Sequence, residues 1–394
     1  MTKDITPSVK FVGVDDLDID LFESQYIVPE GMSYNSYVIL DEKTAVLDTA
    51  DIRKGEDWKA NLKEALGSRR LDYLVVHHME PDHSALIAWV LSEYPSVTLV
   101  ASAAALKMLP QFFEGIALEG RTLAVKEGDT LCLGNHTLRF TLAPMVHWPE
   151  VMVSYEMSEK ILFAADAFGR FGSMEKSAFW GSDDDDWACE ARRYYFNICG
   201  KYGVQVQNLL NKLAGTDISM ICPLHGPILN DNLGYYLGLY QTWSSYGVET
   251  EGIFVAYASI HGGTAAAAER FAQMLRDRAC PKVATADITR SDLAEGVEDA
   301  FRYGKMVLAA SSYDAGVFTP MHDFLYRLQA KGYQKRSVGL IENGSWAPSA
   351  GRVMKEMLGA MKDITVIEPM VTIRSRMHAE DIPKLEALAD AILK

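Results

Sequence analysis

The pattern of apolar and polar positions differs between the first 250 residues or so and the rest of the chain. Over the first 250 residues or so, short β-branched or aromatic runs predict strands, and longer amphipathic stretches between them predict helices. The predicted strands are 35–40, 44–48, 72–76, 130–133, 137–142, 151–155, 160–164 and 218–222, and the predicted helices are 84–93, 186–213 and 233–246. This mixture favours two sheets enclosed by helical layers.

From about residue 251 the pattern becomes a regular alternation of buried-type strands and helices. The predicted strands are 253–258, 283–287, 306–310, 337–341 and 364–367, and the predicted helices are 264–276, 292–303, 320–331, 351–358 and 382–393. Five strands that alternate with helices predict a doubly wound α/β domain. We therefore expect two domains, residues 1–249 and residues 250–394.

The composition limits the classes of partner. Hydrophobic residues make up 48% of the 394 residues and charged residues 23%, which is ordinary for a soluble globular protein. The net charge of −15 disfavours binding to a phosphate backbone, so we expect no nucleic acid as partner. The first residues lack a signal-peptide pattern, and no apolar run approaches the ~20 residues of a membrane span. We expect a cytoplasmic protein without a membrane partner.

The cysteines give no sign of a metal site or a disulfide framework. The five residues are scattered and form no C-x-x-C pair: Cys132, Cys189, Cys199, Cys222 and Cys280. This pattern argues against a zinc ribbon or a cysteine-ligated iron centre and favours small buried side chains. Any metal should therefore be held by histidines and carboxylates.

The densest chemical signal is the segment HHMEPDHSAL, residues 77–86. It follows an apolar strand and precedes a predicted helix, and it places His78, Glu80, Asp82 and His83 within six positions. Side chains at such a strand-to-helix turn can converge on one point, and α/β folds carry their chemistry at the carboxyl ends of strands.

Three further candidates follow later apolar strands: His147, Asp166 and His225. Each could by itself be a capping or hydrogen-bonding residue. Seven such residues at strand ends are more readily explained as metal ligands. His77, next to His78 in an extended segment, should point to the opposite side.

The chemistry of this set favours hard or borderline metals. Four imidazoles and three carboxylates without a thiolate suit iron or manganese, and zinc is possible. Seven ligands are too many for one tetrahedral ion but suit two ions with one bridging carboxylate. The run Asp183 to Asp186 is better explained as a solvated loop, because consecutive residues do not converge on one ion without a turn.

The second domain carries a possible anion site. The segment SIHGGT, residues 259–264, follows a strand and opens a helix, where free N–H groups and the helix dipole favour an anion. A plain glycine-containing turn is the alternative, and the segment does not match the dinucleotide pattern G-x-G-x-x-G. The loops SSYDAGVF (311–318) and ENGSWAP (342–348) should lie at the same edge of the sheet.

The order H-x-E-x-D-H followed by distant His, Asp and His resembles the metallo-β-lactamase superfamily. Hydrolytic members have a histidine where this chain has Glu80, and an anionic oxygen there favours redox-active iron over zinc. Together with the C-terminal α/β domain, the seven positions resemble the flavodiiron proteins (A-type flavoproteins).

This resemblance implies a metallo-β-lactamase-like αββα sandwich followed by a flavodoxin-like doubly wound five-stranded parallel sheet. It assigns one iron to His78, Glu80 and His147, the second iron to Asp82, His83 and His225, and the bridging position to Asp166.

The resemblance to flavodoxin implies that the three loops bind FMN, with Tyr313 and Trp346 as stacking partners. The implied contacts are Ser259, Ile260, His261, Gly262, Gly263, Thr264, Ser311, Ser312, Tyr313, Asp314, Ala315, Gly316, Asn343, Gly344, Ser345, Trp346 and Ala347. The chain departs from the usual pattern at His261 and Gly263 in the first loop and at Asp314 and Ala315 in the second.

The implied activity is the reduction of dioxygen to water, of nitric oxide to nitrous oxide, or of both, with Glu80, Asp166 and Tyr195 as catalytic residues. Tyr194, Trp148 and Phe168 are expected to influence the choice of substrate, which the sequence leaves open. A metallo-β-lactamase-type hydrolase with an accessory flavodoxin domain and a metal-free electron carrier are the alternatives.

The resemblance also implies a head-to-tail homodimer or a dimer of dimers, in which the FMN of one subunit faces the irons of the other. The electron donor would be a separate protein such as rubredoxin or a flavin reductase, because the chain has no C-x-x-C pair of its own.

Overall fold

A computed structural model describes residues 2–394, which divide into two compact units. The first unit comprises the described residues up to Tyr195 together with Val204–Tyr240, and the second comprises Phe196–Gly203 together with Gln241–Lys394. The predicted division between residues 249 and 250 stays a proposal; the first strand of the second unit, β17, begins at Thr250.

Two mixed sheets form the first unit. Within the described residues, one sheet has the order β1-β2-β7-β8-β9-β10-β11 and the other β12-β13-β14-β15-β16. The strands of the first sheet are β1 Lys3–Asp4, β2 Val9–Phe11, β7 Tyr37–Ile39, β8 Ala45–Leu47, β9 Tyr73–Val76, β10 Thr98–Ser102 and β11 Thr122–Val125. Those of the second are β12 Thr130–Cys132, β13 Thr137–Leu142, β14 Met152–Glu156, β15 Ile161–Phe163 and β16 Met220–Cys222. Two short hairpins pair β3 Val14–Asp16 with β6 Met32–Tyr34, and β4 Leu21–Phe22 with β5 Tyr26–Ile27.

The two sheets share one hydrophobic core, which confirms the predicted sandwich. Buried side chains from both sheets form a single cluster, among them Tyr37, Ile39, Leu47, Val75, Leu138, Phe140, Met152 and Phe163. The helices that precede β17 in the chain are α1 Gly55–Leu66, α2 Pro81–Ser84, α3 Ile87–Glu93, α4 Ala103–Phe112, α5 Trp187–Ile198, α6 Gly203–Leu213 and α7 Leu233–Ser244, with 3-10 turns η1 Ile52–Lys54, η2 Gly181–Asp183 and η3 Gly200–Tyr202.

Two helix predictions need correction. The predicted helix 84–93 is two helices, because Pro81 starts the short helix α2 and the chain re-enters a helix only at Ile87. Asp82 and His83 therefore lie on a helical turn. The predicted helix 186–213 is interrupted by η3, where the Tyr246 hydroxyl donates to the Gly200 carbonyl at 2.9 Å and accepts from the Gly203 N–H at 3.3 Å. A side chain distant in sequence thus satisfies backbone groups that a continuous helix would pair internally.

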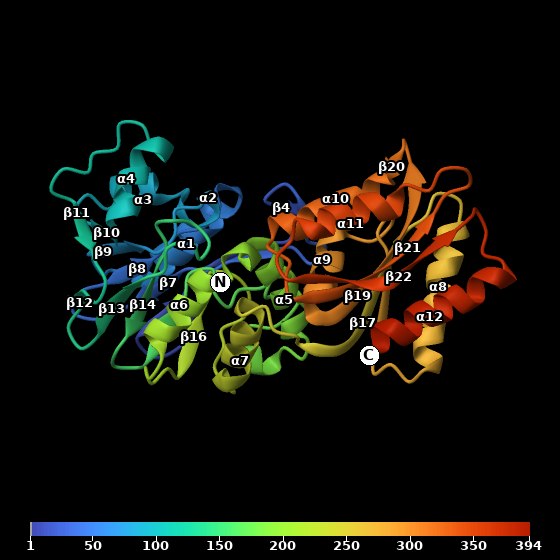
Figure 1. The fold of residues 1–394 in the computed structure, drawn as a ribbon. Coiled ribbons are helices and arrows are strands. Elements are labelled where there is room, and N and C mark those ends of the chain that lie inside the picture. The colour runs from blue at the N-terminus through green and yellow to red at the C-terminus, as the bar shows by residue number, and fades with distance from the viewer. Residues whose placement is uncertain (1) are drawn as a thin grey trace. The chain divides into compact units, whose positions relative to one another are not determined.

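The second unit is a parallel sheet with the order β18-β17-β19-β21-β22 (Figure 1). Its elements are β17 Thr250–Ala258, α8 Gly263–Asp277, β18 Val283–Asp287, α9 Leu293–Arg302, β19 Tyr303–Tyr313, β20 Gly316–Val317, α10 Thr319–Ala330, β21 Arg336–Asn343, α11 Ala350–Gly359, β22 Ile364–Ile373, η4 Ala379–Asp381 and α12 Ile382–Leu393. Helices α8 and α12 pack on one face in a shared core. This is the doubly wound strand order of flavodoxin-like sheets, and it confirms the predicted class of the second unit.

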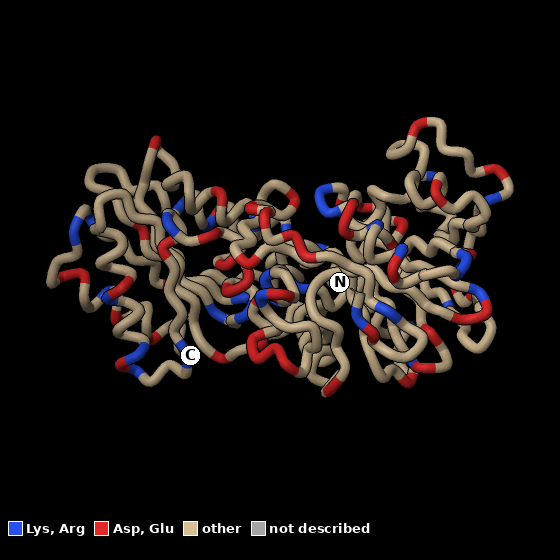
Figure 2. The backbone as a smooth tube through the Cα atoms, turned by 180° about the vertical axis from the view of Figure 1, so that it is seen from behind, with Lys and Arg blue, Asp and Glu red and all other residues tan. Residues whose placement is uncertain are grey.

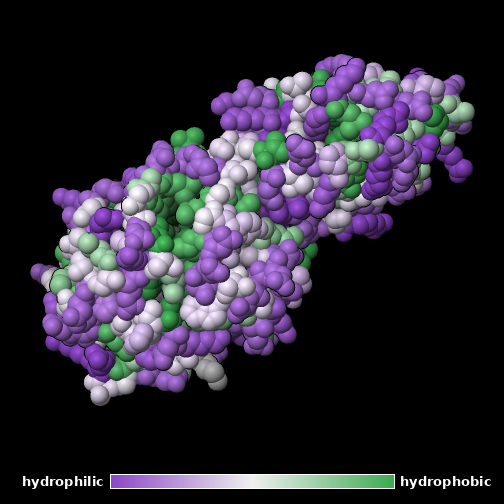
Figure 3. Space-filling view, turned by 90° about the horizontal axis from the view of Figure 1, so that it is seen from below, coloured by the Kyte–Doolittle hydropathy of each residue, from purple (hydrophilic) through white to green (hydrophobic). Residues whose placement is uncertain are grey.

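The surface carries both signs of charge. Figure 2 shows acidic and basic positions interspersed along both units, and Figure 3 shows apolar residues in separate patches on a mostly hydrophilic face. Within residues 2–394, no helix is both long enough and apolar enough to cross a membrane.

Candidate metal centre and cofactor loops

The seven predicted ligands converge in the first unit. They come from the loop after β9, from α2, and from the segments after β13, β15 and β16. Their donor atoms form two groups in which all atoms lie within 4.8 Å of one another. We call them the His78 group (His78, Glu80, His147 and Asp166) and the His83 group (Asp82, His83 and His225).

Asp166 connects the two groups. Its Oδ2 lies 3.3 Å from His78 Nε2 and 3.1 Å from His147 Nε2. Its Oδ1 lies 3.4 Å from His83 Nε2 and 3.7 Å from His225 Nε2. One carboxylate therefore presents one oxygen to each group, which is the geometry of a bridging ligand.

Glu80 completes the His78 group at the position where the hydrolytic pattern has a histidine. Its Oε2 lies 3.1 Å from His78 Nε2 and 3.0 Å from His147 Nε2. In the other group, His83 Nε2 and His225 Nε2 face each other at 3.0 Å. Two ring nitrogens at this distance can share at most one proton, so the arrangement suits a common cation.

Two buried carboxylates of the donor groups have no hydrogen-bond partner within residues 2–394, as expected at a metal site. Both carboxylate oxygens of Asp82 and both of Asp166 are buried without a hydrogen-bond partner among the described residues. Buried carboxylates in such a position are costly unless a cation compensates them. Three carboxylates offset much of the charge of two divalent ions, and four neutral imidazoles complete a donor set that needs no thiolate.

The electrostatics agree with ionised carboxylates. Burial by itself would raise the pKa of Asp166, but the neighbouring His78, His147 and His83 hold this pKa well below its usual range. Burial would likewise lower the pKa of His147, yet the neighbouring carboxylates of Asp166 and Glu80 raise that pKa to about 9. Because a metal binds the neutral imidazole, metal binding at His147 has to compete with this protonation.

Partners outside the groups orient the rings. Glu150 Oε1 accepts a hydrogen bond from His78 Nδ1 at 2.8 Å, and the Ser33 carbonyl accepts one from His225 Nδ1 at 2.7 Å. Both contacts leave Nε2 free to face the group. The sequence analysis did not identify Glu150 or Ser33. The only available signal for Glu150 was a carboxylate three positions after His147.

His77 points away from the donor groups, as expected. Its Nδ1 lies 2.6 Å from Asp48 Oδ2 and its Nε2 lies 2.7 Å from Ser154 Oγ. Asp48 also accepts from the backbone N–H of His77 at 2.7 Å, so it fixes the segment that leads into His78.

Aromatic rings enclose both groups. The Trp148 ring centroid lies 5.3 Å from that of His78, and the Phe22 and Tyr194 centroids lie 5.4 and 5.5 Å from that of His225. Such contacts restrict the imidazoles of His78 and His225.

Tyr195 lies in a neighbouring aromatic chain. Its ring packs edge-on against Tyr240 at 5.2 Å, and Tyr240 stacks on Phe168 at 4.1 Å, two positions after Asp166. Its predicted catalytic role stays a prediction.

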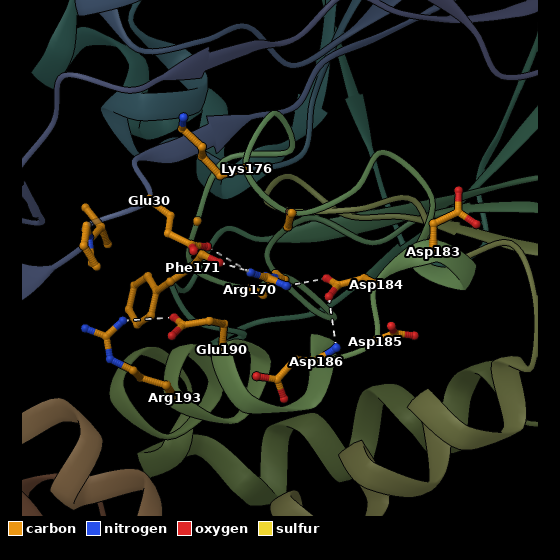
Figure 4. A pocket seen from close by; sticks show the side chains of 14 residues that line it. Glu30, Arg170, Phe171, Lys176, Asp183, Asp184, Asp185, Asp186, Glu190 and Arg193 are labelled. Carbon is orange, nitrogen blue, oxygen red and sulfur yellow. Dashed lines mark hydrogen bonds and ion pairs between the residues drawn. The ribbon is translucent and has the colours of Figure 1, made fainter.

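A separate polar cavity of about 430 Å³ is lined by charged side chains, among them Glu30, Arg170, Asp184, Glu190 and Arg193 (Figure 4). Arg170 in its wall forms an ion pair with Asp184 and packs where a Cβ on Gly226 would lie, 2.4 Å from the Arg170 Cγ. Within the run 183–186, Asp184 thus pairs with Arg170, while Asp183, Asp185 and Asp186 are exposed. This agrees with a loop rather than a metal site.

The first candidate cofactor loop surrounds the start of α8. Gly262 has a left-handed φ of 86°, and the Ser259 hydroxyl accepts its N–H at 3.1 Å. A Cβ on Gly263 would lie 2.1 Å from the Ser375 carbonyl, so only glycine fits there. Thr264 Oγ1 and Ser311 Oγ are 2.8 Å apart and join the first loop to β19. Ile260 and His261 lie exposed at the tip of this loop.

The other two loops need a correction of their boundaries. β19 runs to Tyr313 and β21 to Asn343, so Ser311, Ser312, Tyr313 and Asn343 are strand residues and not loop residues. Pairing to neighbouring strands extends both elements beyond the local apolar pattern.

Loop residues proper begin after these strands. Asp314 and Ala315, with φ of 47° and 57°, form the two-residue turn between Tyr313 and Gly316. Gly344, Ser345, Trp346 and Ala347 follow β21.

The two aromatic candidates at this edge are accessible. Tyr313 is 49% exposed and Trp346 is 89% exposed. Exposed rings beside a helix N-terminus suit a flat aromatic group that carries a phosphate. The sequence analysis missed Ser375, which contacts both Gly263 and Asn343.

The chain is similar to known proteins in sequence and in fold. Residues 32–226 match the model of the ODP family beta lactamase. The chain is 28% identical over 326 residues to the anaerobic nitric oxide reductase flavorubredoxin of Vibrio vulnificus, with 81% of this chain and 65% of that protein covered. The chain spans only 46% to 65% of the length of the first three curated relatives it matches.

Two solved structures share the fold over the whole chain. Rubredoxin oxygen:oxidoreductase from Desulfovibrio gigas matches with a TM-score of 0.89 and 23% identity, covering 100% of this chain and 98% of that one. The flavodiiron protein from Giardia intestinalis matches with a TM-score of 0.90 and 22% identity, covering 99% and 96%.

Fold and donor set together define a metallo-β-lactamase-like domain followed by a flavodoxin-like domain, as predicted. The chain thus carries a match to the ODP family beta lactamase over residues 32–226, and it is similar in fold to flavodiiron proteins over its whole length.

Proposed function

We propose that the chain is a flavodiiron oxidoreductase that reduces dioxygen to water, nitric oxide to nitrous oxide, or both. The observation that carries this proposal is the position of Asp166, whose two oxygens face the His78 group and the His83 group separately. A single-ion site would not require a carboxylate divided in this way. Glu80 in the His78 group supports iron over zinc.

The donor groups would hold two iron ions, which supply electrons and open coordination positions for a small diatomic ligand, while FMN relays electrons to them. Asp166 would bridge, and Glu80 and Asp82 would each complete one group. The rings of Trp148 and Tyr194 exclude bulk water from the site. A closed site of this kind favours a diatomic substrate over a large one.

The second unit would hold FMN by its phosphate and by its ring. The N–H groups at the start of α8 and the hydroxyl of Thr264 would receive the phosphate. The exposed rings of Tyr313 and Trp346 would cover the flavin. We propose residues 250–394 as the functional flavin domain.

Electron delivery requires partners. We propose a head-to-tail homodimer or a dimer of dimers, in which the flavin of one subunit faces the donor groups of the other. Rubredoxin or a flavin reductase would serve as donor, in line with the name of the Desulfovibrio gigas protein. We place the protein in the cytoplasm.

The test is an anaerobic metal and activity analysis of the full chain. The protein should retain two irons and one FMN per chain and consume dioxygen or nitric oxide when reduced. Asp166→Asn should abolish that consumption while FMN stays bound, and Asp185→Asn, an exposed carboxylate of the same unit, should leave the consumption unchanged.

Two results would contradict the proposal. The first is full diatomic consumption in Asp166→Asn. The second is zinc in the purified protein together with hydrolytic activity, which would support a hydrolase. Rates with both gases on one reduced preparation decide the substrate preference.

A further inference from the structure

Glu150 connects the loop that carries His147 to the His78 side chain. Its side chain is fully buried, and its Oε1 accepts both the Met79 N–H at 2.9 Å and His78 Nδ1 at 2.8 Å. Glu150 lies three positions after His147, in the same loop. One carboxylate therefore holds His78 in place from the segment that carries His147.

The loop itself is anchored at Glu150. The Ser102 hydroxyl donates to the Glu150 carbonyl at 2.8 Å and accepts the Ala105 N–H at 3.1 Å, so it also caps helix α4. Glu150 is thus fixed at its backbone by a helix start and at its side chain by the ligand segment. It is rigid enough to impose one ring orientation on His78.

The His83 group has no comparable partner within the described residues. His225 Nδ1 bonds to a neutral acceptor, the Ser33 carbonyl, at 2.7 Å. His83 Nδ1 is buried and has no hydrogen-bond partner among residues 2–394. The two groups therefore differ in the charge of the partners of their imidazole Nδ1 atoms, although their metal-facing donor atoms are similar.

A carboxylate behind a ligating imidazole makes the ring a stronger donor, and removing such a partner weakens metal binding about 10- to 100-fold. We infer that Glu150 is a positioning residue that makes the two metal positions unequal, so that the ion in the His78 group binds more tightly and leaves last. This inference rests on the proposed two-metal site.

The first experiment measures the two binding constants. Metal-free full-length chain is titrated with cobalt(II) by calorimetry, and two constants that differ about 10- to 100-fold are expected. Glu150→Gln keeps an oxygen acceptor for Met79 and His78 but removes the charge. It should weaken the tighter constant about 10-fold and leave the weaker one unchanged.

A matched control is available in the same unit. Glu156 is also fully buried, and its carboxylate accepts backbone N–H groups, those of Ser158 at 3.0 Å and Glu159 at 2.6 Å. Glu156→Gln removes an equally buried charge that touches neither donor group, and both constants should stay as in the wild type. Equal constants in the wild type, or an unchanged tighter constant in Glu150→Gln, would overturn the inference.

The second experiment needs no variant. Crystals of the cobalt-loaded wild-type chain are treated with a chelator until one ion per chain remains, and anomalous scattering locates it. The remaining ion should lie in the His78 group; an ion in the His83 group, or equal occupancy of both, overturns the inference. A wild-type chain that never binds a second ion contradicts the proposed two-metal function instead, so the two failures are distinguishable.

Discussion

Asn343 and Ser375 form a closed pair of hydrogen bonds at the edge of the flavodoxin-like sheet. The Asn343 side-chain nitrogen donates to the Ser375 carbonyl at 3.0 Å, and the Ser375 N–H donates to the Asn343 Oδ1 at 2.9 Å. The same Ser375 carbonyl lies against Gly263 at the start of α8. The buried Asn343 amide therefore joins the end of β21 to the segment after β22, which in turn contacts the first cofactor loop.

Replacing this amide should weaken FMN binding. Asn343→Leu leaves the backbone groups of Ser375 without their partners, which costs about 1–3 kcal/mol if they stay buried. We expect the dissociation constant for FMN, measured by flavin fluorescence, to rise about ten-fold or more.

Gln334 serves as the control, since it lies near the opposite end of β21 and bonds to the Gly332 carbonyl at 2.9 Å. Gln334→Ala should bind FMN like the wild type. An unchanged affinity in Asn343→Leu would show that the pair does not shape the flavin site.

Gly263→Ala should prevent the first loop from closing. The added Cβ would lie 2.1 Å from the Ser375 carbonyl, and a backbone atom cannot move aside cheaply. We expect loss of FMN and a lower melting temperature. Gly359→Ala, where a Cβ meets no atom within 4 Å, should keep both properties of the wild type. Stoichiometric FMN in purified Gly263→Ala would refute this account.

Gly226→Ala should remove one metal ion. Gly226 follows His225, and its Cβ would lie 2.4 Å from the Arg170 Cγ, so the loop after β16 that carries His225 has to shift. Arg170 is held by Asp184 and cannot leave freely (Figure 4). We expect metal analysis to find about one ion per chain instead of the proposed two, with the loss from the His83 group.

The variant Gly215→Ala serves as a control that tests backbone strain without the steric clash. Its φ of 79° is close to the 76° of Gly226, but a Cβ there meets no atom within 4 Å. Gly215→Ala should cost only the left-handed strain of about 1–2 kcal/mol and keep the metal. Equal metal content in both variants would contradict the prediction.

His136 should make the stability of the first domain depend on pH. Burial lowers its pKa, but hydrogen bonds to Asp41, at 2.8 Å, and to Glu159 raise the pKa above its usual value. Burial raises the pKa of Asp41, whereas its hydrogen bonds from His136 hold that pKa low.

The direction of the effect follows from these shifts. Because the pKa of His136 is higher in the folded chain than in the unfolded chain, protonated His136 stabilises the fold. This contribution is complete at pH values below the unfolded pKa of about 6.5, and it is lost as the pH rises through the folded pKa. Ionised Asp41 stabilises the fold at pH values above its unfolded pKa of about 3.9, because its pKa is lower in the folded chain. This contribution is lost as the pH falls through the folded pKa.

The variant His136→Gln should therefore reduce the urea midpoint more at about pH 6 than at about pH 9. His322→Gln, at an exposed histidine of the second unit, should show no such difference. Equal losses for His136→Gln at both pH values would contradict the assignment.

Local patterns in the sequence were sufficient for the architecture and for selecting the seven side chains that the structure brings together. The alternation from residue 251 predicted the parallel sheet, because the burial period of strands and helices is a local property. His78, Glu80, Asp82 and His83 were recognisable because they share one strand-to-helix turn. The order of the remaining donors then matched a known family.

Only the tertiary structure decided how these residues meet. That Asp166 divides its oxygens between two groups depends on the relative positions of several strand ends, which no local spacing encodes. Glu150 and His78 are 72 positions apart, Ser33 and His225 are 192 apart, and Ser375 meets Asn343 across 32. A side-chain hydrogen bond needs its two atoms placed within a few tenths of an ångström, and that precision arises when the sheets pack, not from the pattern of any single segment.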